Sequence, residues 1–162
     1  MKRLRFQVLS VGRIKEGYLK EGIQEYLKRL RPYVAVELAE GLEEKTPPNP
    51  SDATIEAVIE KEGQRILERL KDGDYVVALD SRGKALTSEQ LAGFLEARMN
   101  ASIGRIVWII GGSHGLSQAV LDRADYTLSL SNLTFLHQMT GMILLEQLYR
   151  GFKIIRGEPY HK

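Results

Sequence analysis

The sequence predicts an α/β fold in which helices cover both faces of a mostly parallel sheet. Two nearly continuous apolar runs, Tyr75–Asp80 and Ile106–Ile110, are typical of strands buried on both faces. Segments with apolar residues at helical spacing alternate with such runs along the chain, as βα units require. The 162 residues suit one domain spanning residues 1–162, with enough chain for one core but not for two.

The first third of the chain supplies two strands, a helix and a loop. An apolar segment, Phe6–Val11, predicts the first strand, and apolar residues at helical spacing over residues 18–30 predict a helix that Pro32 stops. Alternation over Val34–Leu38 predicts a second strand. Gly41–Pro50 holds three of the five prolines, so we expect a loop there.

Capping signals mark the next two helices. Ser51 or Asp52 can cap a helix whose apolar positions continue to Leu70. Thr87 and Gln90 have the spacing of a capping box ahead of another apolar helical segment. These helices flank the buried strand at residues 75–80, as a βαβ arrangement requires.

The last third begins with the second buried strand and the glycine-rich segment that follows it. Gly111–Ser117 reads GGSHGLS, and its final serine can cap a short helix. Tyr126–Leu130 predicts the last strand, and a final helix is expected over roughly Thr134–Arg150.

Composition excludes several classes of protein. The chain has no cysteine, so it has neither a disulfide framework nor a thiolate metal site. Its apolar runs are too short to span a bilayer, and we find no secretory signal sequence. The formal net charge is only +2, but residues 1–33 carry nine Lys/Arg against three Glu, whereas residues 37–62 carry two Lys against eight Asp/Glu. This segregation fits either a basic RNA-binding face or ordinary solvated helix faces.

The ends of the buried strands are the expected ligand site, because parallel sheets bind ligands beyond the carboxyl ends of their strands. The relevant residues follow Leu79, Ile110 and Leu130. The glycines after Ile110 match neither a Walker A loop nor a dinucleotide fingerprint, so they indicate either a tight turn or a backbone surface for a ligand. The polar segment 131–135 is equally compatible with a helix cap at Thr134 and with a ligand-binding loop.

The remaining candidate groups lie on the final helix and the tail. The three histidines, His114, His137 and His161, have no partner at ligand spacing, so a metal site is not expected. Glu146 lies four residues before Arg150 and can simply pair with it. The basic and aromatic residues of this region suit phosphate contacts and base stacking, or else form the polar face and frayed end of a helix.

Together these segments resemble one family, the 23S rRNA (pseudouridine-1915) N3-methyltransferases of the SPOUT superfamily. The resemblance covers essentially the whole chain, including Val8–Gly12 and Glu62–Arg65. The segments that carry it are Leu79-Asp80, IGGSHGLS at Ile110–Ser117, LSNLTFLHQM at Leu130–Met139, and LLEQLYRGFKIIRGEPYHK at Leu144–Lys162.

The resemblance implies a C-terminal trefoil knot, a rare exception to unknotted topology. It also implies a cytoplasmic homodimer whose knotted regions pair to form the active sites, S-adenosylmethionine as methyl donor, and 23S rRNA within the assembled ribosome as substrate. The implied donor site consists of Leu79, Gly111, Leu130, Ser131, Asn132, Leu133, Thr134 and Phe135.

The implied chemistry is direct displacement, in which N3 of the pseudouridine attacks the donor methyl. The catalytic candidates are His161, as the group that moves a proton or orients the base, with Glu146 and Arg150. The candidate RNA-binding residues are Arg150, Lys153, Arg156 and Tyr160. Two alternatives stay open: a SPOUT enzyme acting on another rRNA or tRNA site, and a non-catalytic ribosome-associated relative.

Two positions depart from the family pattern. Leu136 stands where the family usually has proline, and Gly141 stands where it has arginine. Glycine inside a helix should cost about 1 kcal/mol.

Overall fold

The computed structural model describes residues 3–161, and its five strands form one parallel sheet in the order β2-β1-β4-β3-β5. The predicted α/β class is therefore confirmed. The strands are β1 (Arg5–Ser10), β2 (Ala35–Ala39), β3 (Tyr75–Ala85), β4 (Arg105–Ile110) and β5 (Tyr126–Ser129). The helices are α1 (Gly17–Leu30), α2 (Asp52–Leu67), α3 (Ser88–Asn100), α4 (Gln118–Arg123) and α5 (His137–Ile155).

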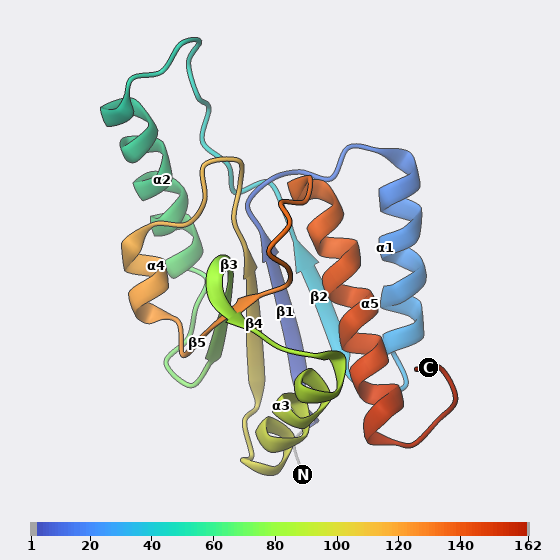
Figure 1. Cartoon of the computed structure of the whole chain (residues 1–162). Coiled ribbons are helices and arrows are strands. Elements are labelled where there is room, and N and C mark those ends of the chain that lie inside the picture. The colour runs from blue at the N-terminus through green and yellow to red at the C-terminus, as the bar shows by residue number, and fades with distance from the viewer. Residues whose placement is uncertain (1–2, 162) are drawn as a thin grey trace.

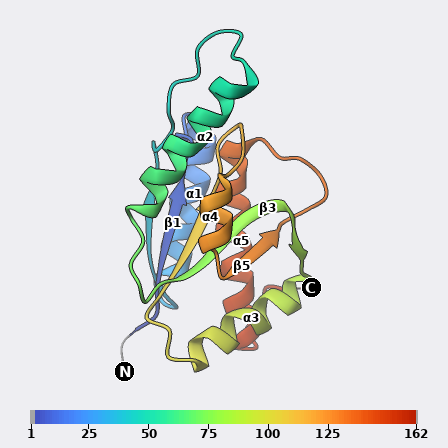
Figure 2. The same ribbon diagram turned by 90° about the vertical axis from the view of Figure 1, so that its left-hand side faces the viewer.

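The helices form two layers on either side of the sheet (Figure 1). Helices α2 and α4 cover one face, which is turned toward the viewer in Figure 2, while α1 and α5 cover the other face and α3 packs beside α5. Successive residues of β4 enter opposite layers: Trp108 packs with the α1/α3/α5 core, and Val107 and Ile109 pack with the α2/α4 core. Burial on both faces explains why this strand is apolar throughout.

Side-chain caps fix three helix starts as the sequence predicted. Ser51 accepts from the Thr54 backbone N–H, and Ser117 accepts from that of Val120. Thr87 and Gln90 form the complete capping box that begins α3. These caps set where α3 and α4 begin, next to the ends of strands β3 and β4.

The final helix differs from its predicted bounds. It begins at His137 instead of near Thr134, and its N-cap is Leu136, whose side chain makes no capping hydrogen bond. Segment 131–135 stays irregular because the Ser131 hydroxyl accepts the Leu133 backbone N–H at 2.9 Å. The helix also continues past Arg150 to Ile155, because the buried Phe152 belongs to the core.

Strand β3 is longer than the predicted segment 75–80. After a register shift between Leu79 and Lys84 it pairs a second time with β5, through Lys84 and Ala85. The extension was not predicted because its side chains are mostly exposed and polar. Gly83 makes the close approach possible, since a Cβ there would lie 2.6 Å from the Thr127 carbonyl oxygen.

Candidate methyl-donor and RNA site

A cavity of about 360 Å³ lies at the carboxyl ends of β3 and β4 and beside the segment that follows β5. We call it the donor cavity, after the donor-site residues predicted from the sequence. It is lined by Leu79, Asp80, Ser81, Ile110, Gly111, Gly112, Ser113, Gly115, Leu116, Leu130, Ser131, Leu133, Thr134, Phe135 and Thr140. Seven of the eight predicted donor-site residues are in this lining. The exception is Asn132, which is exposed and does not line the cavity.

The glycine-rich segment forms both a tight turn and a wall of the cavity. The Gly115 N–H donates to the Gly112 carbonyl at 3.1 Å, and Gly115 has a φ of +88°, in the left-handed region that suits glycine. A Cβ on Gly111 would lie 3.2 Å from the Gly115 carbonyl carbon. The predicted tight turn is therefore present, and the same residues line the cavity.

The opposite wall, residues 130–135, is held from both ends. The Ser129 hydroxyl donates to the Ser131 carbonyl at 3.2 Å. Beyond the loop, Gln138 Oε1 accepts the Lys15 backbone N–H at 2.9 Å, which ties the start of α5 to the segment after β1. Thr140 of α5 completes the wall; the sequence reasoning missed it because a helical threonine carries no distinctive pattern.

The lining carries almost no free charge. Among the described residues that form it, Asp80 is the one charged side chain, and Arg82 binds it through Nε and Nη2, each at 3.0 Å. These hydrogen bonds lower the pKa of Asp80, although burial opposes the shift. What remains is a surface of hydroxyls, carbonyls and apolar groups, which suits a ligand with a positive charge better than lysine or arginine would.

A buried carboxylate stands behind the glycine turn. Glu62 of α2 is 5% exposed; its Oε2 accepts the Glu44 backbone N–H at 3.0 Å, and its Oε1 has no hydrogen-bond partner among residues 3–161. Oε1 would lie 3.8 Å from a Cβ on Gly112. Burial raises the pKa of Glu62. The sequence offered no signal for this residue beyond its place in a resembling segment.

The catalytic candidates on α5 and the C-terminal tail form a second cluster with Glu89 of α3, which we call the tail cluster: Glu89, Glu146, Arg150, Tyr160 and His161. Arg150 binds Glu146 Oε1 through Nη2 at 2.6 Å and Nε at 3.0 Å, and the Tyr160 hydroxyl donates to the same oxygen at 3.1 Å. His161 Nδ1 lies 3.1 Å from Arg150 Nη1, and its Nε2 lies 2.5 Å from Glu89 Oε1. The structure thus brings Glu146, Arg150, Tyr160 and His161 together and adds Glu89, which the sequence reasoning missed.

These contacts define one tautomer of His161. A guanidinium only donates, so Nδ1 must accept from Arg150 and the proton must sit on Nε2, facing Glu89. The pKa of Glu89 is lowered, first by its own backbone N–H and then by His161. Both ring nitrogens are therefore engaged, and within one chain His161 does not line the donor cavity.

Lys153 and Arg156, the other two RNA-binding candidates, lie beside a neighbouring cluster of aromatic side chains. Lys153 pairs with Glu158 at 3.3 Å, and the Arg156 guanidinium lies 4.7 Å from the centre of the Tyr33 ring. Tyr160 packs edge-on against Tyr149, with ring centres 4.9 Å apart. In this chain the tail aromatics therefore pack against one another and against cations.

A smaller cavity of about 210 Å³ lies next to the donor cavity. Leu130 lines both this cavity and the donor cavity. Its opposite wall holds Ser88 and Gln147, whose side chains are hydrogen-bonded at 2.7 Å, and Gln147 also donates to Glu146 at 2.8 Å. The polar network of α5 therefore reaches this smaller cavity, which shares Leu130 with the donor cavity.

Two further properties concern the described part of the chain. Within residues 3–161 there is no group of three or more His, Cys, Asp or Glu side chains placed to hold a metal ion. Nor does that part of the chain contain a helix with the length and apolar character needed to cross a membrane.

The fold and site together define an α/β protein with an uncharged ligand cavity at the carboxyl edge of its sheet. The family described as "Predicted SPOUT methyltransferase" matches residues 4–161. The chain belongs to the SPOUT methyltransferase family. Membership implies the trefoil-knotted C-terminal path expected from the resemblance.

Curated relatives agree over nearly the whole length. The chain is 52% identical over 159 residues to "Ribosomal RNA large subunit methyltransferase H" of Halothermothrix orenii, covering 98% of this chain and 100% of that one. It is 54% identical over 155 residues to the protein of the same name from Alkaliphilus oremlandii, covering 96% and 98%. These relatives support the rRNA methyltransferase assignment as well as the family.

A solved structure shows the same fold. It is a probable methylase family protein from Haemophilus influenzae Rd KW20, with a TM-score of 0.50 and 14% identity, covering 99% of this chain and 71% of that one.

Proposed function

We propose that this chain is an S-adenosylmethionine-dependent methyltransferase that methylates N3 of a pseudouridine in 23S rRNA. The observation that carries the proposal is the donor cavity at the carboxyl ends of β3 and β4, in a chain that matches ribosomal RNA large subunit methyltransferases from end to end. Its volume of about 360 Å³ suits a small cofactor. Its uncharged lining of hydroxyls and carbonyls suits a cationic sulfonium.

S-adenosylmethionine, when bound, supplies an electrophilic methyl on a sulfonium that is already a good leaving group. The chain's contribution is mainly positioning. Residues 130–135 and the turn at Gly111–Leu116 form the two walls that would hold the donor, and Thr140 closes the space between them. Anchoring of this site through Gln138 keeps the walls in a fixed relation.

Proton removal from N3 would fall to the tail cluster of the partner subunit in the proposed homodimer, since within one chain His161 does not line the donor cavity. His161 has a lone pair on Nδ1, which accepts from Arg150 in this structure, so release of that contact would free Nδ1 to accept the N3 proton. Arg150 would then stabilise the negative charge that the pseudouridine ring carries once N3 has lost its proton. Glu146 holds the guanidinium in place and, with its carboxylate occupied by Arg150 and Tyr160, serves as an orienting group.

The proposal extends to the assembly and its partner. Three large apolar side chains, Leu133, Leu136 and Met139, are 74%, 50% and 36% exposed beside the donor cavity, which supports a homodimer formed over this surface. Arg150, Lys153, Arg156 and Tyr160 would contact rRNA of the assembled ribosome, in the cytoplasm, and residues 1–162 would act as one domain.

The test is methyl transfer from labelled S-adenosylmethionine to ribosomes from cells that lack this enzyme, with mass mapping of the modified nucleotide. A single methyl on a 23S pseudouridine is the expected result. Transfer to tRNA or to another rRNA position would replace the substrate, and donor binding without transfer to any RNA would favour a non-catalytic role. His161→Ala, assayed in single turnover, should lose methylation while keeping donor affinity; full methylation would remove His161 from the mechanism.

A further inference from the structure

A further concave surface lies at the end of the sheet opposite the donor cavity, where strands β1 and β4 begin. It encloses about 690 Å³. It is lined by Arg3, Arg5, Ala35, Lys71, Gly73, Asp74, Gly104 and Arg105. None of these residues belongs to the donor cavity or to the tail cluster.

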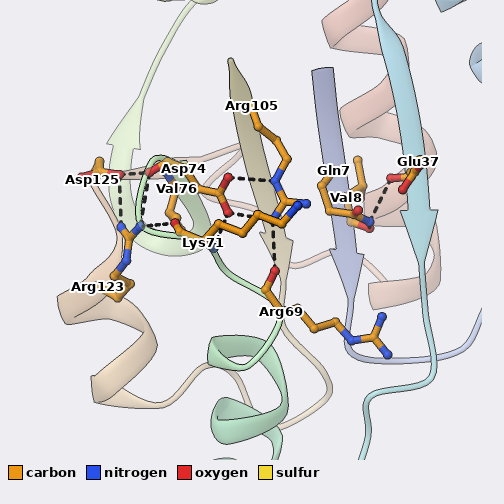
Figure 3. Close-up of polar contacts among 10 residues, drawn as sticks. All are labelled: Gln7, Val8, Glu37, Arg69, Lys71, Asp74, Val76, Arg105, Arg123 and Asp125. Atoms are coloured by element: carbon orange, nitrogen blue, oxygen red, sulfur yellow. Dashed lines mark hydrogen bonds and ion pairs between the residues drawn. The ribbon is translucent and has the colours of Figure 1, made fainter. Parts of the chain in front are cut away.

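The carboxylate in this cavity is already neutralised (Figure 3). Asp74 is buried, and Arg105 binds it through Nε at 2.8 Å and Nη2 at 2.7 Å, while the Lys71 backbone N–H donates to it at 2.7 Å. Arg105 is held in turn by the Arg69 carbonyl at 3.0 Å. The pair is therefore a fixed, internally compensated part of the wall.

The remaining cations are not compensated in this way. Arg5 and Lys71 are exposed, and within residues 3–161 neither side chain has an ion pair or a hydrogen bond. Arg3 also lines the cavity and donates to the Arg31 carbonyl, which orients its guanidinium without neutralising it. Three uncompensated positive charges thus converge on one concave surface.

The surroundings lower this positive charge but do not cancel it. Two further carboxylates are close by, Asp72 in the same turn and Glu37, which acts on Arg105 from β2. The cations Arg69 and Arg123 flank the same turn, and Arg123 donates to the Asp74 carbonyl at 3.2 Å. Arg123 is itself paired with Asp125 at 3.4 Å, so Arg69 is left to offset Asp72 and Glu37, and the three lining cations still give this surface a net positive charge.

The cavity floor is bare backbone. A Cβ added at Gly73 or at Gly104 would meet no atom within 4 Å, so both glycines face open space. Among the described residues that line it, Ala35 alone contributes an apolar side chain. A positively charged surface with few apolar side chains and an accessible backbone suits phosphate groups and offers little to an apolar ligand.

We propose that this surface binds the sugar–phosphate backbone of the rRNA at a point remote from the methylated nucleotide. The inference rests on the proposed function for its RNA partner. The length of β4 separates the two sites, which at about 3.3 Å per residue is roughly 20 Å. A contact at that distance cannot reach the target nucleotide itself, but it can reach the backbone of a large folded RNA and fix the enzyme's orientation on it.

The test compares two double variants that remove the same charge. R5A/K71A removes the two unpaired cations of this surface. K45A/K61A removes two exposed lysines from the acidic segment 37–62, where phosphate contacts are not expected. Binding to ribosomes without methyl donor is measured at several salt concentrations, together with S-adenosylmethionine affinity by calorimetry and folding by circular dichroism.

R5A/K71A should weaken ribosome binding by about tenfold or more and should lower the salt slope by roughly one for each phosphate group that the variant no longer binds. K45A/K61A should change neither quantity, and both variants should keep wild-type donor affinity. Unchanged ribosome affinity in R5A/K71A, or an equal loss in the control, would refute the surface. A weakening seen with ribosomes but not with naked 23S rRNA would assign the surface to a ribosomal protein and would also refute the proposal.

Failure of the proposed function would look different. In that case wild-type protein would neither bind the donor nor methylate ribosomes, whatever the two double variants did.

Discussion

Replacing Gly141 with alanine should stabilise the protein. Gly141 lies inside α5 and is buried, and a Cβ there would meet Ile23 Cδ1 at 3.7 Å and Ile110 Cδ1 at 3.9 Å, which are ordinary van der Waals contacts. Alanine gains about 1 kcal/mol over glycine in a helix interior, and the buried methyl adds up to about 0.8 kcal/mol. The free energy of unfolding should therefore rise by about 1–2 kcal/mol.

Gly151→Ala is the matched control, because it lies in the same helix and has the same backbone gain. Its Cβ would lie 2.8 Å from Leu95 Cδ1 in the core, so repacking should offset the gain. Urea denaturation at one protein concentration measures the free energy of unfolding of both variants. In thermal unfolding, each kcal/mol should shift the melting temperature by about 2–4 °C. The reasoning is refuted if Gly141→Ala is no more stable than wild type, or if Gly151→Ala gains as much.

Three further changes have definite expected outcomes. Burial raises the pKa of Glu62 above its unfolded value of 4.5, so the free energy of unfolding falls as pH rises from 4.5 through the folded-state pKa. Glu62→Gln should therefore gain about 1–3 kcal/mol near neutral pH and nothing below about pH 4. Urea curves offset equally at every pH would contradict this. Burial is the largest single influence on Asp74 and opposes its ionisation, but the Arg105 guanidinium and the Lys71 backbone N–H together lower its pKa. That stability is present above 3.8 and lost on acidification, so Asp74→Asn should cost about 3 kcal/mol at neutral pH by denaturation and flatten the acid limb; a loss below about 1 kcal/mol would show the pair to be dispensable. Leu133→Asp should shift sedimentation toward the monomer, whereas Tyr18→Asp, at a side chain 64% exposed, should not; equal behaviour of the two would count against the proposed dimer surface.

The sequence predicted the fold well where one local pattern determines the structure. The runs at β3 and β4 are apolar because both faces are buried, and the caps at Ser51, Thr87 and Ser117 act within three residues. Prediction failed where distant contacts decide. The second pairing of β3 depends on β5, and the far end of α5 depends on burial of Phe152.

The same distinction applies to the site. Most of the residues that line the cavity were predicted as a ligand site from strand ends and from family motifs, each a short continuous segment. Glu89 contacts His161 across 72 residues, and Glu62 meets the glycine turn only through the packing of α2. Neither has a local pattern, because an exposed helical glutamate and a buried one look alike in sequence.

Helix α5 fixes the spacing between the donor cavity and the tail cluster, since it carries Thr140 at one and Arg150 at the other. Ten residues of uninterrupted helix place them roughly 15 Å apart. Inserting or deleting one residue between them would turn the downstream half by about 100° and carry Arg150, together with the His161 that it contacts, away from Glu89. The stretch 141–149 should therefore tolerate no change of length, even at positions where the side chain itself could be replaced.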